Sequence, residues 1–432
     1  MSLATATRVI APARNLLGSL RLPGDKSISH RYALLGGLAH GTTRLENFST
    51  GADPASSLGC VAALGAKVQR DGASVTIEGC GGRFQPAGAP LDCGNSGSTM
   101  RMLAGLLAAQ KGSFTLVGDA SLSRRPMERI RRPLEAMGAR IALTDGRAPL
   151  IIEGRPLKAI DYTTPVPSAQ VKTAVLFAGL NAEGTTTVRE SVRTRDHGEI
   201  ALEAFGVTLA RQTDAVSIAG GQSLQGVDAV IPGDISSAAF FLCAAALFPD
   251  SGLLLDNLGL NPTRATLLDV LATLGAKTSV LNLEQRNGEL AGTVQLIAPK
   301  DGLSGATISG ALAAQLIDEL PVLAAIAPYT RNGIRIRDAK ELRVKESDRI
   351  ALVAENLRRM GAEVTEVEDG MDVAGGQALH GAEIDSGDDH RIAMAFSVAA
   401  LRASGESTIH GAESADISFP EFFSLLDQVA VR

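Results

Sequence analysis

The chain contains no tryptophan, and aromatic residues make up only 3% of its 432 positions. Its core must therefore be built from alanine, leucine, valine and isoleucine. The shortage of aromatic side chains disfavours stacking of nucleic-acid bases as its main activity. The formal net charge of −6 argues in the same direction, because nucleic-acid-binding surfaces are basic. We therefore expect no nucleic-acid partner.

Long hydrophobic runs are also missing. The longest one, Ala238 to Phe248, is far too short to span a bilayer. The first eight residues, Met-Ser-Leu-Ala-Thr-Ala-Thr-Arg, lack the charged-then-apolar pattern of a secretory signal. These observations predict a cytoplasmic protein without a membrane partner.

Cysteine and histidine are too few and too scattered for a metal site. The four cysteines stand singly, with no C-x-x-C pair, so they are interpreted as structural thiols of a reducing compartment. No G-x-G-x-x-G motif follows an expected strand, and Gly24-Asp-Lys-Ser27 lacks the spacing of a P-loop. We expect no metal, and the motifs give no reason to expect ATP or a dinucleotide.

What the sequence does contain is a repeat. Six segments of roughly 70 residues each combine an Ala/Leu-rich helix, a glycine and a short β-branched strand. A second helix follows in each segment, and in five of them it ends at a glycine: Gly65, Gly138, Gly206, Gly275 and Gly361. Each unit reads as helix, strand, helix, strand, hairpin, strand. Six such units predict an α/β protein of two pseudo-symmetric domains. A solenoid is the alternative, although its repeats are usually shorter.

Two matching tetrapeptides indicate where the chain changes domain. Leu22-Pro-Gly-Asp25 and Ile231-Pro-Gly-Asp234 lie three units apart, and each precedes an expected helix. Pro-Gly pairs form turns, so we interpret both as crossings with hinge character. The first domain would then comprise residues 1–22 and 235–432, and the second residues 23–234.

Basic residues gather at the beginnings of the expected helices. Serine, aspartate and asparagine there are explained as N-caps alone. A lysine or arginine is not, because the helix dipole disfavours cations at that end. We infer that anionic ligands compensate these charges. The residues concerned are Lys26, Arg31, Arg101, Arg125, Lys172 and Arg391.

The segment Arg337 to Arg349 carries the densest charge pattern. We expect Lys345, Glu346 and Arg349 to share one face in the first turn of a helix that ends near Gly361. A carboxylate between two cations suits proton transfer beside a bound anion. The alternative is a solvated helix start with ordinary ion pairs.

Another charged segment is Arg195-Asp-His-Gly-Glu199. His197 and Glu199 do not share a helix face, and ordinary hydrogen bonding is the more common role for such a pair.

Taken together, the motifs resemble one known family. LPGDKSISHR, CGNSGSTMR, SRRPM, SAQVK, NPTR, RVKESDR and DDHRIAM occur in this order from about residue 20 to residue 423. They resemble the 5-enolpyruvylshikimate-3-phosphate synthases, and the residues from Arg195 to Glu199 are similar to the class II subgroup, many of whose members tolerate glyphosate.

The resemblance implies a two-domain inside-out α/β barrel of six units, three per domain, that closes over its substrates. It implies transfer of the enolpyruvyl group of phosphoenolpyruvate to the 5-hydroxyl of shikimate 3-phosphate. Phosphate would be released through a tetrahedral ketal phosphate intermediate in aromatic amino acid biosynthesis. Neither a metal nor an organic cofactor is required, and a monomer is expected.

The resemblance also assigns roles by matching motifs. Asp318 would take the proton from the 5-hydroxyl, and Glu346 would protonate the methylene carbon and later remove a proton. Lys26 is the third residue expected in catalysis, and Lys345 would help to hold Asp318 charged. Shikimate 3-phosphate would be bound by Lys26, Ser27, Arg31, Ser168, Ala169, Gln170, Arg195, Asp318 and Lys345. Phosphoenolpyruvate would be bound by Lys26, Gly97, Arg125, Gln170, Arg349 and Arg391.

The sequence departs from the family pattern at two positions. Ile417 stands where class I enzymes carry a lysine. Gly97 stands where the tolerant class II pattern has alanine, and glycine leaves room for the longer inhibitor. We hypothesise that Gly97 favours glyphosate binding and that Gly97→Ala raises tolerance.

Two alternative functions stay open at this point. The sister family, UDP-N-acetylglucosamine enolpyruvyl transferase, usually has Lys-Asn where this chain has Lys26-Ser27. It also carries a reactive cysteine on a mobile loop, whereas residues 121–127 contain none and Cys93 lies elsewhere. A non-catalytic repeat scaffold that binds anionic partners is the second alternative, and it would not require Asp318 and Glu346 together.

Overall fold

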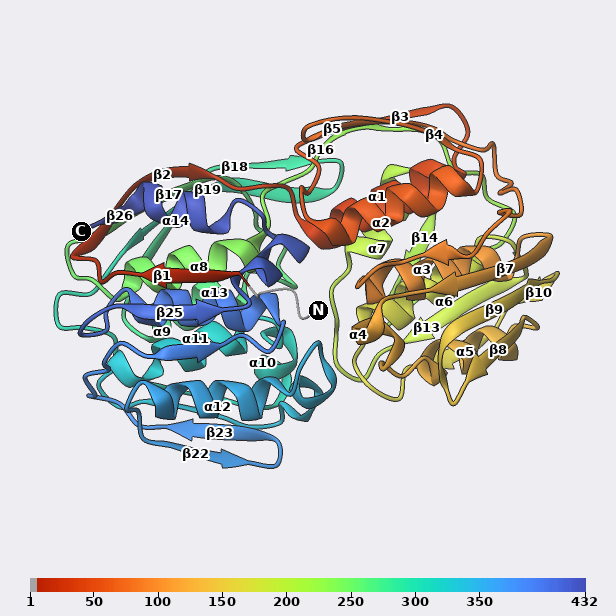
Figure 1. Ribbon diagram of the computed structural model, residues 1–432. Coiled ribbons are helices and arrows are strands. Elements are labelled where there is room, and N and C mark those ends of the chain that lie inside the picture. The colour runs from red at the N-terminus through yellow and green to blue at the C-terminus, as the bar shows by residue number, and fades with distance from the viewer. Residues whose placement is uncertain (1–5) are drawn as a thin grey trace. The chain divides into compact units, whose positions relative to one another are not determined.

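The computed structural model describes residues 6–432, which fold into two compact α/β units (Figure 1). Unit 1 contains the residues up to Leu22 together with Pro232–Glu284 and Leu290–Arg432. Unit 2 contains Pro23–Ile231 and Gln285–Glu289.

Unit 2 is built from three successive repeats. The first comprises α1 (Lys26–Leu38), β3 (Thr42–Glu46), α2 (Ala52–Ala63), β4 (Lys67–Asp71), β5 (Ser74–Glu78) and β6 (Leu91–Asp92). The second comprises α3 (Gly97–Ala108), β7 (Gly112–Val117), α4 (Ala120–Ser123), α5 (Glu128–Ala136), β8 (Arg140–Thr144), β9 (Arg147–Gly154), β10 (Leu157–Lys158) and β11 (Asp161–Thr163). The third comprises α6 (Ala169–Gly179), β12 (Ala182–Glu183), β13 (Thr185–Arg189), α7 (His197–Ala204), β14 (Leu209–Arg211), β15 (Ala215–Ala219) and β16 (Asp228–Val230).

Unit 1 has the same plan and takes in the N-terminal strands β1 (Thr7–Ile10) and β2 (Asn15–Arg21). Its first repeat comprises α8 (Ile235–Ala246), β17 (Gly252–Gly259), α9 (Thr266–Thr273), β18 (Lys277–Arg286), β19 (Glu289–Ile297) and β20 (Ala306–Ile308). The second comprises α10 (Gly310–Gln315), α11 (Leu320–Ile326), η1 (Ala327–Tyr329), β21 (Ile334–Ile336), η2 (Lys340–Val344), α12 (Arg349–Arg359), β22 (Val364–Val367), β23 (Gly370–Val373) and β24 (Glu383–Asp385). The third comprises α13 (His390–Ala400), β25 (Ser407–His410), η3 (Ala412–Ile417), α14 (Phe422–Val429) and β26 (Ala430–Val431).

One sheet pattern recurs in both units. In unit 2 the strand orders are β16-β3-β5-β4, β6-β7-β9-β8 and β11-β13-β15-β14, and β20-β21-β23-β22 in unit 1 repeats them. In each sheet the first pair is parallel and the others are antiparallel. In three of these four sheets the parallel pair encloses the buried helix of its repeat as a crossover.

Helices form the inside of each unit. Every residue of α8, α11 and α13 is buried, and α1, α3 and α6 are almost as completely enclosed. Figure 1 shows the sheets of each unit outside these helices, which is the inside-out arrangement expected from the sequence. Within residues 6–432 each sheet is open, so the barrel expected from the sequence is formed by separate sheets around helices.

The glycines that end the second helices confirm the repeat. Gly65, Gly138, Gly206, Gly275 and Gly361 have φ values of 105°, 109°, 89°, 103° and 89°. This left-handed conformation is open to glycine at little cost, and it turns each helix into the following strand. The spacing of glycines in the sequence therefore marks the same structural step five times.

Residues 285–289 group with unit 2, although they lie inside the range expected for the first domain. They comprise the end of β18, the turn at residues 287–288 and the first residue of β19. Asn287 Nδ2 donates to the carbonyl of Asp228 at 3.3 Å, and Glu289 contacts His197 Nδ1 at 2.6 Å. These contacts explain the grouping, which chain order alone does not show.

Close packing of α3 on α6 gives a first prediction. A Cβ on Gly105 would lie 2.1 Å from the carbonyl oxygen of Ala174, so Gly105→Ala should force the helices apart. We expect this overpacking to cost about 1–3 kcal/mol and to lower the melting temperature. Gly59→Ala in α2 is the matched control, because nothing lies within 4 Å of its Cβ position. Thermal melts that rank the two variants equally would contradict the prediction.

Candidate functional site

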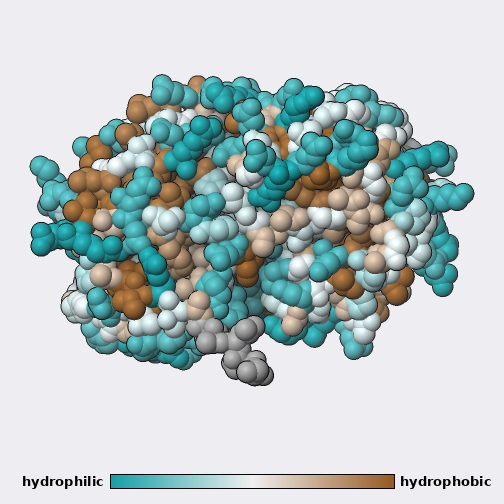
Figure 2. Space-filling model, turned by 45° about the horizontal axis from the view of Figure 1, so that its top comes forward, coloured by the Kyte–Doolittle hydropathy of each residue, from teal (hydrophilic) through white to brown (hydrophobic). Residues whose placement is uncertain are grey.

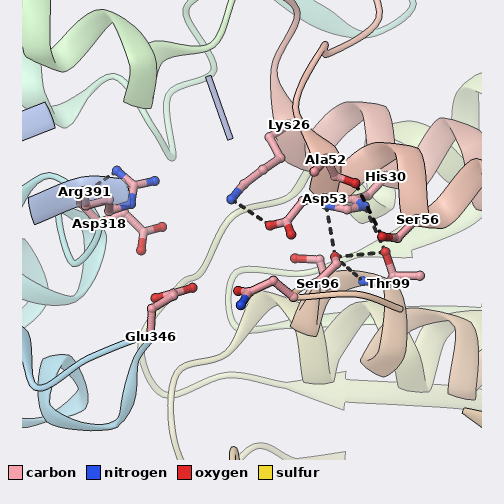
Figure 3. A network of polar contacts seen from close by, with 12 residues as sticks. Lys26, His30, Ala52, Asp53, Ser56, Ser96, Thr99, Asp318, Glu346 and Arg391 are labelled. Atoms are coloured by element: carbon pink, nitrogen blue, oxygen red, sulfur yellow. Dashed lines mark hydrogen bonds and ion pairs between the residues drawn. The ribbon is translucent and has the colours of Figure 1, made fainter. Parts of the chain in front are cut away.

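In unit 2, helix α1 presents a lysine at its first position. Asp25 caps the helix by accepting the amide of Ile28 at 2.9 Å, and Lys26 follows it directly. The Lys26 Nζ atom lies 3.3 Å from Oδ2 of Asp53, which belongs to the first turn of α2 (Figure 3). A carboxylate from a second helix thus holds the lysine at this helix start.

Arg31 lies on the same helix and is only 3% exposed. Its Nη1 donates to the carbonyl of Ser27 at 2.8 Å, and its Nη2 donates to Thr173 Oγ1 at 3.2 Å. Burial lowers the pKa of Arg31 to about 10, and the nearby Glu199 opposes this shift. The guanidinium therefore keeps its charge at neutral pH while it is shielded from water.

A buried polar network links the beginnings of α1, α2 and α3 (Figure 3). His30 Nδ1 lies 2.8 Å from Ser57 Oγ, which in turn lies 2.8 Å from Thr99 Oγ1. Ser96 caps α3 by accepting the amide of Thr99 at 3.0 Å. Burial, assisted by Lys26 and Arg31, holds the pKa of His30 well below its ordinary value, so His30 is a neutral link in this network.

The first turn of α3 lies beside the first turn of α6. Arg101 Nη1 donates to Gln170 Oε1 at 2.7 Å, and Gln170 Nε2 donates to Ser98 Oγ at 2.9 Å. Arg125, between α4 and α5, donates to Asn95 Oδ1 at 2.7 Å. A Cβ on Gly97 would lie 2.7 Å from Arg101 Nη1 and 3.5 Å from Arg125 Nη1. The structure thus brings Gly97, Arg125 and Gln170 together.

Helix α6 begins as the sequence predicts. Ser168 is its N-cap and accepts the amide of Val171 at 3.4 Å, and Ala169 is the first helical residue. Lys172 differs from the prediction, because its side chain is only 2% exposed and contacts Glu190 and Glu199. Protein carboxylates compensate this cation, so the expectation of a ligand-facing lysine is wrong here. Arg195 precedes Asp196, the N-cap of α7.

In unit 1, Arg349 is the centre of an ion cluster. Its side chain is 1% exposed, and its Nε lies 2.8 Å from Asp389 Oδ2. Its Nη2 lies 2.6 Å from Glu346 Oε2, and its Nη1 lies 3.8 Å from Asp318 Oδ1. Burial alone would lower the pKa of Arg349, but the surrounding carboxylates raise it overall.

Asp318 lies just before α11 and is held on several sides. Its Oδ1 is 3.6 Å from Lys345 Nζ, and its carbonyl accepts a hydrogen bond from Arg391 Nη1 at 2.7 Å. Figure 3 shows Asp318 beside Arg391, with Glu346 nearby. The two carboxylates therefore lie among three cations, and a third carboxylate, Asp389, balances the formal charge of the cluster. Cations fixed beside a carboxylate suit proton transfer next to a bound anion.

The helix expected around Lys345 and Glu346 begins later than predicted. Asp348 caps α12 by accepting the amide of Ala351 at 3.1 Å, so Arg349 is its first residue. Lys345 and Glu346 lie in the segment between η2 and α12. The expected shared helix face is therefore wrong, although Glu346 still reaches Arg349.

Sequence reasoning did not single out Asp389, which caps α13. It accepts the amide of Arg391 at 2.9 Å and the hydroxyl of Ser347 at 2.9 Å, and it contacts Arg349. Burial by itself would raise the pKa of Asp389, but the Arg349 guanidinium keeps it below its ordinary value. The signal in the sequence was an aspartate directly before the His-Arg pair at the start of a buried helix.

Two further observations bear on function. Among residues 6–432, no group of three or more His, Cys, Asp or Glu side chains is arranged to hold a metal ion. None of the helices in the same range is long and apolar enough to cross a membrane. In the view of Figure 2, the hydrophobic side chains form separate patches among hydrophilic ones.

The fold and these clusters define a two-domain α/β protein whose helix starts carry cations and carboxylates suited to anionic substrates. The sequence model of EPSP synthase (3-phosphoshikimate 1-carboxyvinyltransferase) matches residues 10–426. The chain therefore belongs to the EPSP synthase family, which is a family of transferases.

Individual relatives agree with this assignment. The chain is 62% identical over 424 residues to a 3-phosphoshikimate 1-carboxyvinyltransferase of Koribacter versatilis, covering 98% of this chain and 99% of the relative. It is 53% identical to the protein of that name from Solibacter usitatus, with the same coverage. A solved EPSP synthase from Acinetobacter baumannii is 39% identical and superimposes with a TM-score of 0.87 over 98% of both chains.

Proposed function

We propose that this protein transfers the enolpyruvyl group of phosphoenolpyruvate to the 5-hydroxyl of shikimate 3-phosphate and releases phosphate. The observation that carries the proposal is the match to one family over nearly the whole chain, together with Asp318 and Glu346 in one ion cluster of unit 1. A non-catalytic scaffold gives no reason for that pair of carboxylates.

Unit 2 would supply most of the contacts to shikimate 3-phosphate. This substrate carries a phosphate and a carboxylate, and arginine forks bind such groups in a bidentate manner. Arg31 and Arg195 would provide the forks, and the N-terminus of α6 would provide backbone amides and the Ser168 hydroxyl. Lys26, Ser27, Ala169 and Gln170 complete the proposed set in this unit.

Phosphoenolpyruvate is also doubly anionic. We propose that Lys26, Gly97, Arg125 and Gln170 of unit 2 bind it, together with Arg349 and Arg391 of unit 1. The close grouping of Gly97, Gln170 and Arg125 supports the first part of this set. Arg349 itself is buried and paired with Asp389 and Glu346, so its place in this set is carried by the match to the family motif alone.

In the proposed reaction, Asp318 accepts the proton of the 5-hydroxyl as the oxygen attacks C2 of phosphoenolpyruvate. Glu346 donates a proton to C3, and a tetrahedral ketal phosphate forms. Glu346 then removes a proton from the new methyl group while the C–O bond to phosphate breaks, and the leaving phosphate takes up the proton held by Asp318. Lys345, 3.6 Å from Asp318, and Arg349, 2.6 Å from Glu346, hold the two carboxylates in place.

The test is phosphate release from phosphoenolpyruvate with each of two acceptors. Release with shikimate 3-phosphate and none with UDP-N-acetylglucosamine is the expected result. Phosphate release with UDP-N-acetylglucosamine alone would assign the protein the activity of UDP-N-acetylglucosamine enolpyruvyl transferase. No phosphate release with either acceptor would overturn the proposal.

We also propose that the protein is a cytoplasmic monomer. The four cysteines are free, which suits a reducing compartment. Sedimentation of the purified protein would test the oligomeric state.

Glyphosate is proposed as an inhibitor that competes with phosphoenolpyruvate near Gly97. The methyl group of Gly97→Ala would approach Arg101 Nη1 and disturb its bond to Gln170. We expect the inhibition constant for glyphosate to rise by about tenfold or more, which corresponds to about 1.4 kcal/mol of lost binding free energy. Phosphoenolpyruvate affinity should fall less. An unchanged inhibition constant would remove this account.

A further inference from the structure

A buried ion cluster joins two motifs of unit 2 that are separate in the sequence. Lys172 Nζ lies 2.7 Å from Glu190 Oε2 and 2.8 Å from Glu199 Oε1. The side chains of Lys172, Glu190 and Glu199 are 2%, 9% and 5% exposed. Lys172 belongs to the SAQVK segment and Glu199 to the RDHGE segment, so the cluster connects helix α6 to helix α7.

The cluster cannot itself be an anion site. Its one ammonium group faces two carboxylates, so its formal charge is negative, and the lysine is shielded from solvent. A buried ion pair is also weak evidence for stability, because desolvation offsets much of the attraction. Its role must therefore be sought in what it holds in place.

Helices α1 and α7 both approach the first turns of α6 at Thr173, the residue next to Lys172. The Thr173 hydroxyl accepts Nη2 of Arg31 from α1 at 3.2 Å. The same hydroxyl would lie 2.5 Å from a Cβ on Gly198, so only glycine lets the first turn of α7 approach this closely. These contacts of Thr173, the residue next to Lys172, therefore join α1 and α7 to α6.

The groups on these helix starts are those assigned above to one substrate. Ser168 lies four residues before Lys172, Arg195 lies four residues before Glu199, and Arg31 contacts Thr173. Glu190 begins the segment that leads to Arg195, and it accepts the hydroxyl of Thr194. Lys172 is thus on the helix that Ser168 caps, and Glu190 and Glu199 lie on the two sides of Arg195 in the chain.

We propose that Lys172, Glu190 and Glu199 are positioning residues that fix Arg31, Ser168 and Arg195 relative to one another and so set the affinity for shikimate 3-phosphate. The inference rests on the proposed function. It explains why SAQVK and RDHGE both occur in this chain: Lys172 and Glu199 are the two halves of one ion pair.

The test compares Glu199→Gln with Glu203→Gln. Both changes are on α7, but Glu203 lies one turn further along, is 42% exposed and pairs with Arg211. For Glu199→Gln we expect the KM for shikimate 3-phosphate to rise about ten- to hundredfold. This is the loss of affinity typical when a side chain that orients a metal ligand is removed. We expect the KM for phosphoenolpyruvate to change by less than about threefold, and Glu203→Gln to behave like the parent.

Two further variants separate positioning from folding. Glu190→Gln removes the other carboxylate and should raise the same KM. Lys172→Met combined with Glu199→Gln should cost no more than the larger single change, because residues of one network are not additive. Calorimetric titration of each variant with shikimate 3-phosphate alone gives the affinity directly, and melting curves show whether the fold is intact.

The outcomes are distinct. A folded Glu199→Gln variant with parental affinity for shikimate 3-phosphate would overturn the inference while leaving the proposed function intact. Equal loss of affinity for both substrates, together with a fall in melting temperature, would also overturn it in favour of a purely structural role. If the parent protein neither binds shikimate 3-phosphate nor turns it over, the proposed function itself fails.

Discussion

Glu346→Gln should lower the turnover number by roughly two to four orders of magnitude, which is the contribution expected of a group that transfers protons to and from carbon. Glutamine keeps the shape of the side chain and an oxygen that can accept from Arg349, 2.6 Å away in the parent protein. It cannot give up or take up the proton that the reaction requires. Substrate affinity should therefore stay within several-fold of the parental value.

The measurement is turnover by phosphate release, combined with calorimetric affinity for shikimate 3-phosphate. Glu355→Gln is the matched control, because Glu355 is on the exposed face of α12 and pairs only locally with Arg359. A Glu346→Gln variant with near-normal turnover would remove Glu346 from its proposed role. A variant that loses binding and turnover together would indicate a role in holding Arg349.

The sequence predicted the repeat and the helix starts because both depend on local chemistry. A glycine after a helix can adopt positive φ at little cost, and all five predicted helix-ending glycines do so. Asp25, Ser96 and Ser168 each cap a helix by accepting the amide three residues further along the chain. Such features depend on a few neighbouring residues of the chain and need no distant partner.

The features that sequence reasoning missed depend on distant partners. Lys172 looked like a cation open to a ligand, because its carboxylate partners Glu190 and Glu199 are 18 and 27 positions away in the chain. The three-residue spacing of Glu346 and Arg349 predicts that both side chains lie on one face of a helix. In the structure Asp348 starts the helix instead. Tertiary contacts decided both cases, and no periodicity in the sequence reports them.

Asp389→Asn should be the most damaging change outside the residues assigned to substrate. Asparagine can still accept the amide of Arg391, so helix α13 keeps its cap. Its amide group would however place a donor against the Arg349 guanidinium, which then loses its carboxylate partner at 2.8 Å. We expect kcat/KM to fall about ten- to hundredfold because Arg349 is misplaced. The size of this effect is taken from side chains that orient a metal ligand in other proteins. Steady-state kinetics with both substrates would check this.

The same variant should lose about 1.5–3 kcal/mol of stability at neutral pH, because the buried guanidinium keeps Glu346 but loses its charge-assisted bonds to Asp389. The pKa of Asp389 is lower in the folded protein than its ordinary value, so its charge stabilises the fold above the unfolded pKa of about 3.9. That contribution is lost as pH falls through the folded pKa, and the two proteins should converge in stability there. Asp388→Asn is the control, since Asp388 is exposed and has φ of 56°, a conformation that asparagine also tolerates. If Asp388→Asn and Asp389→Asn were equally active and equally stable, Arg349 would not depend on the Asp389 carboxylate, and the ion cluster would have to be held by Glu346 and Asp318 alone.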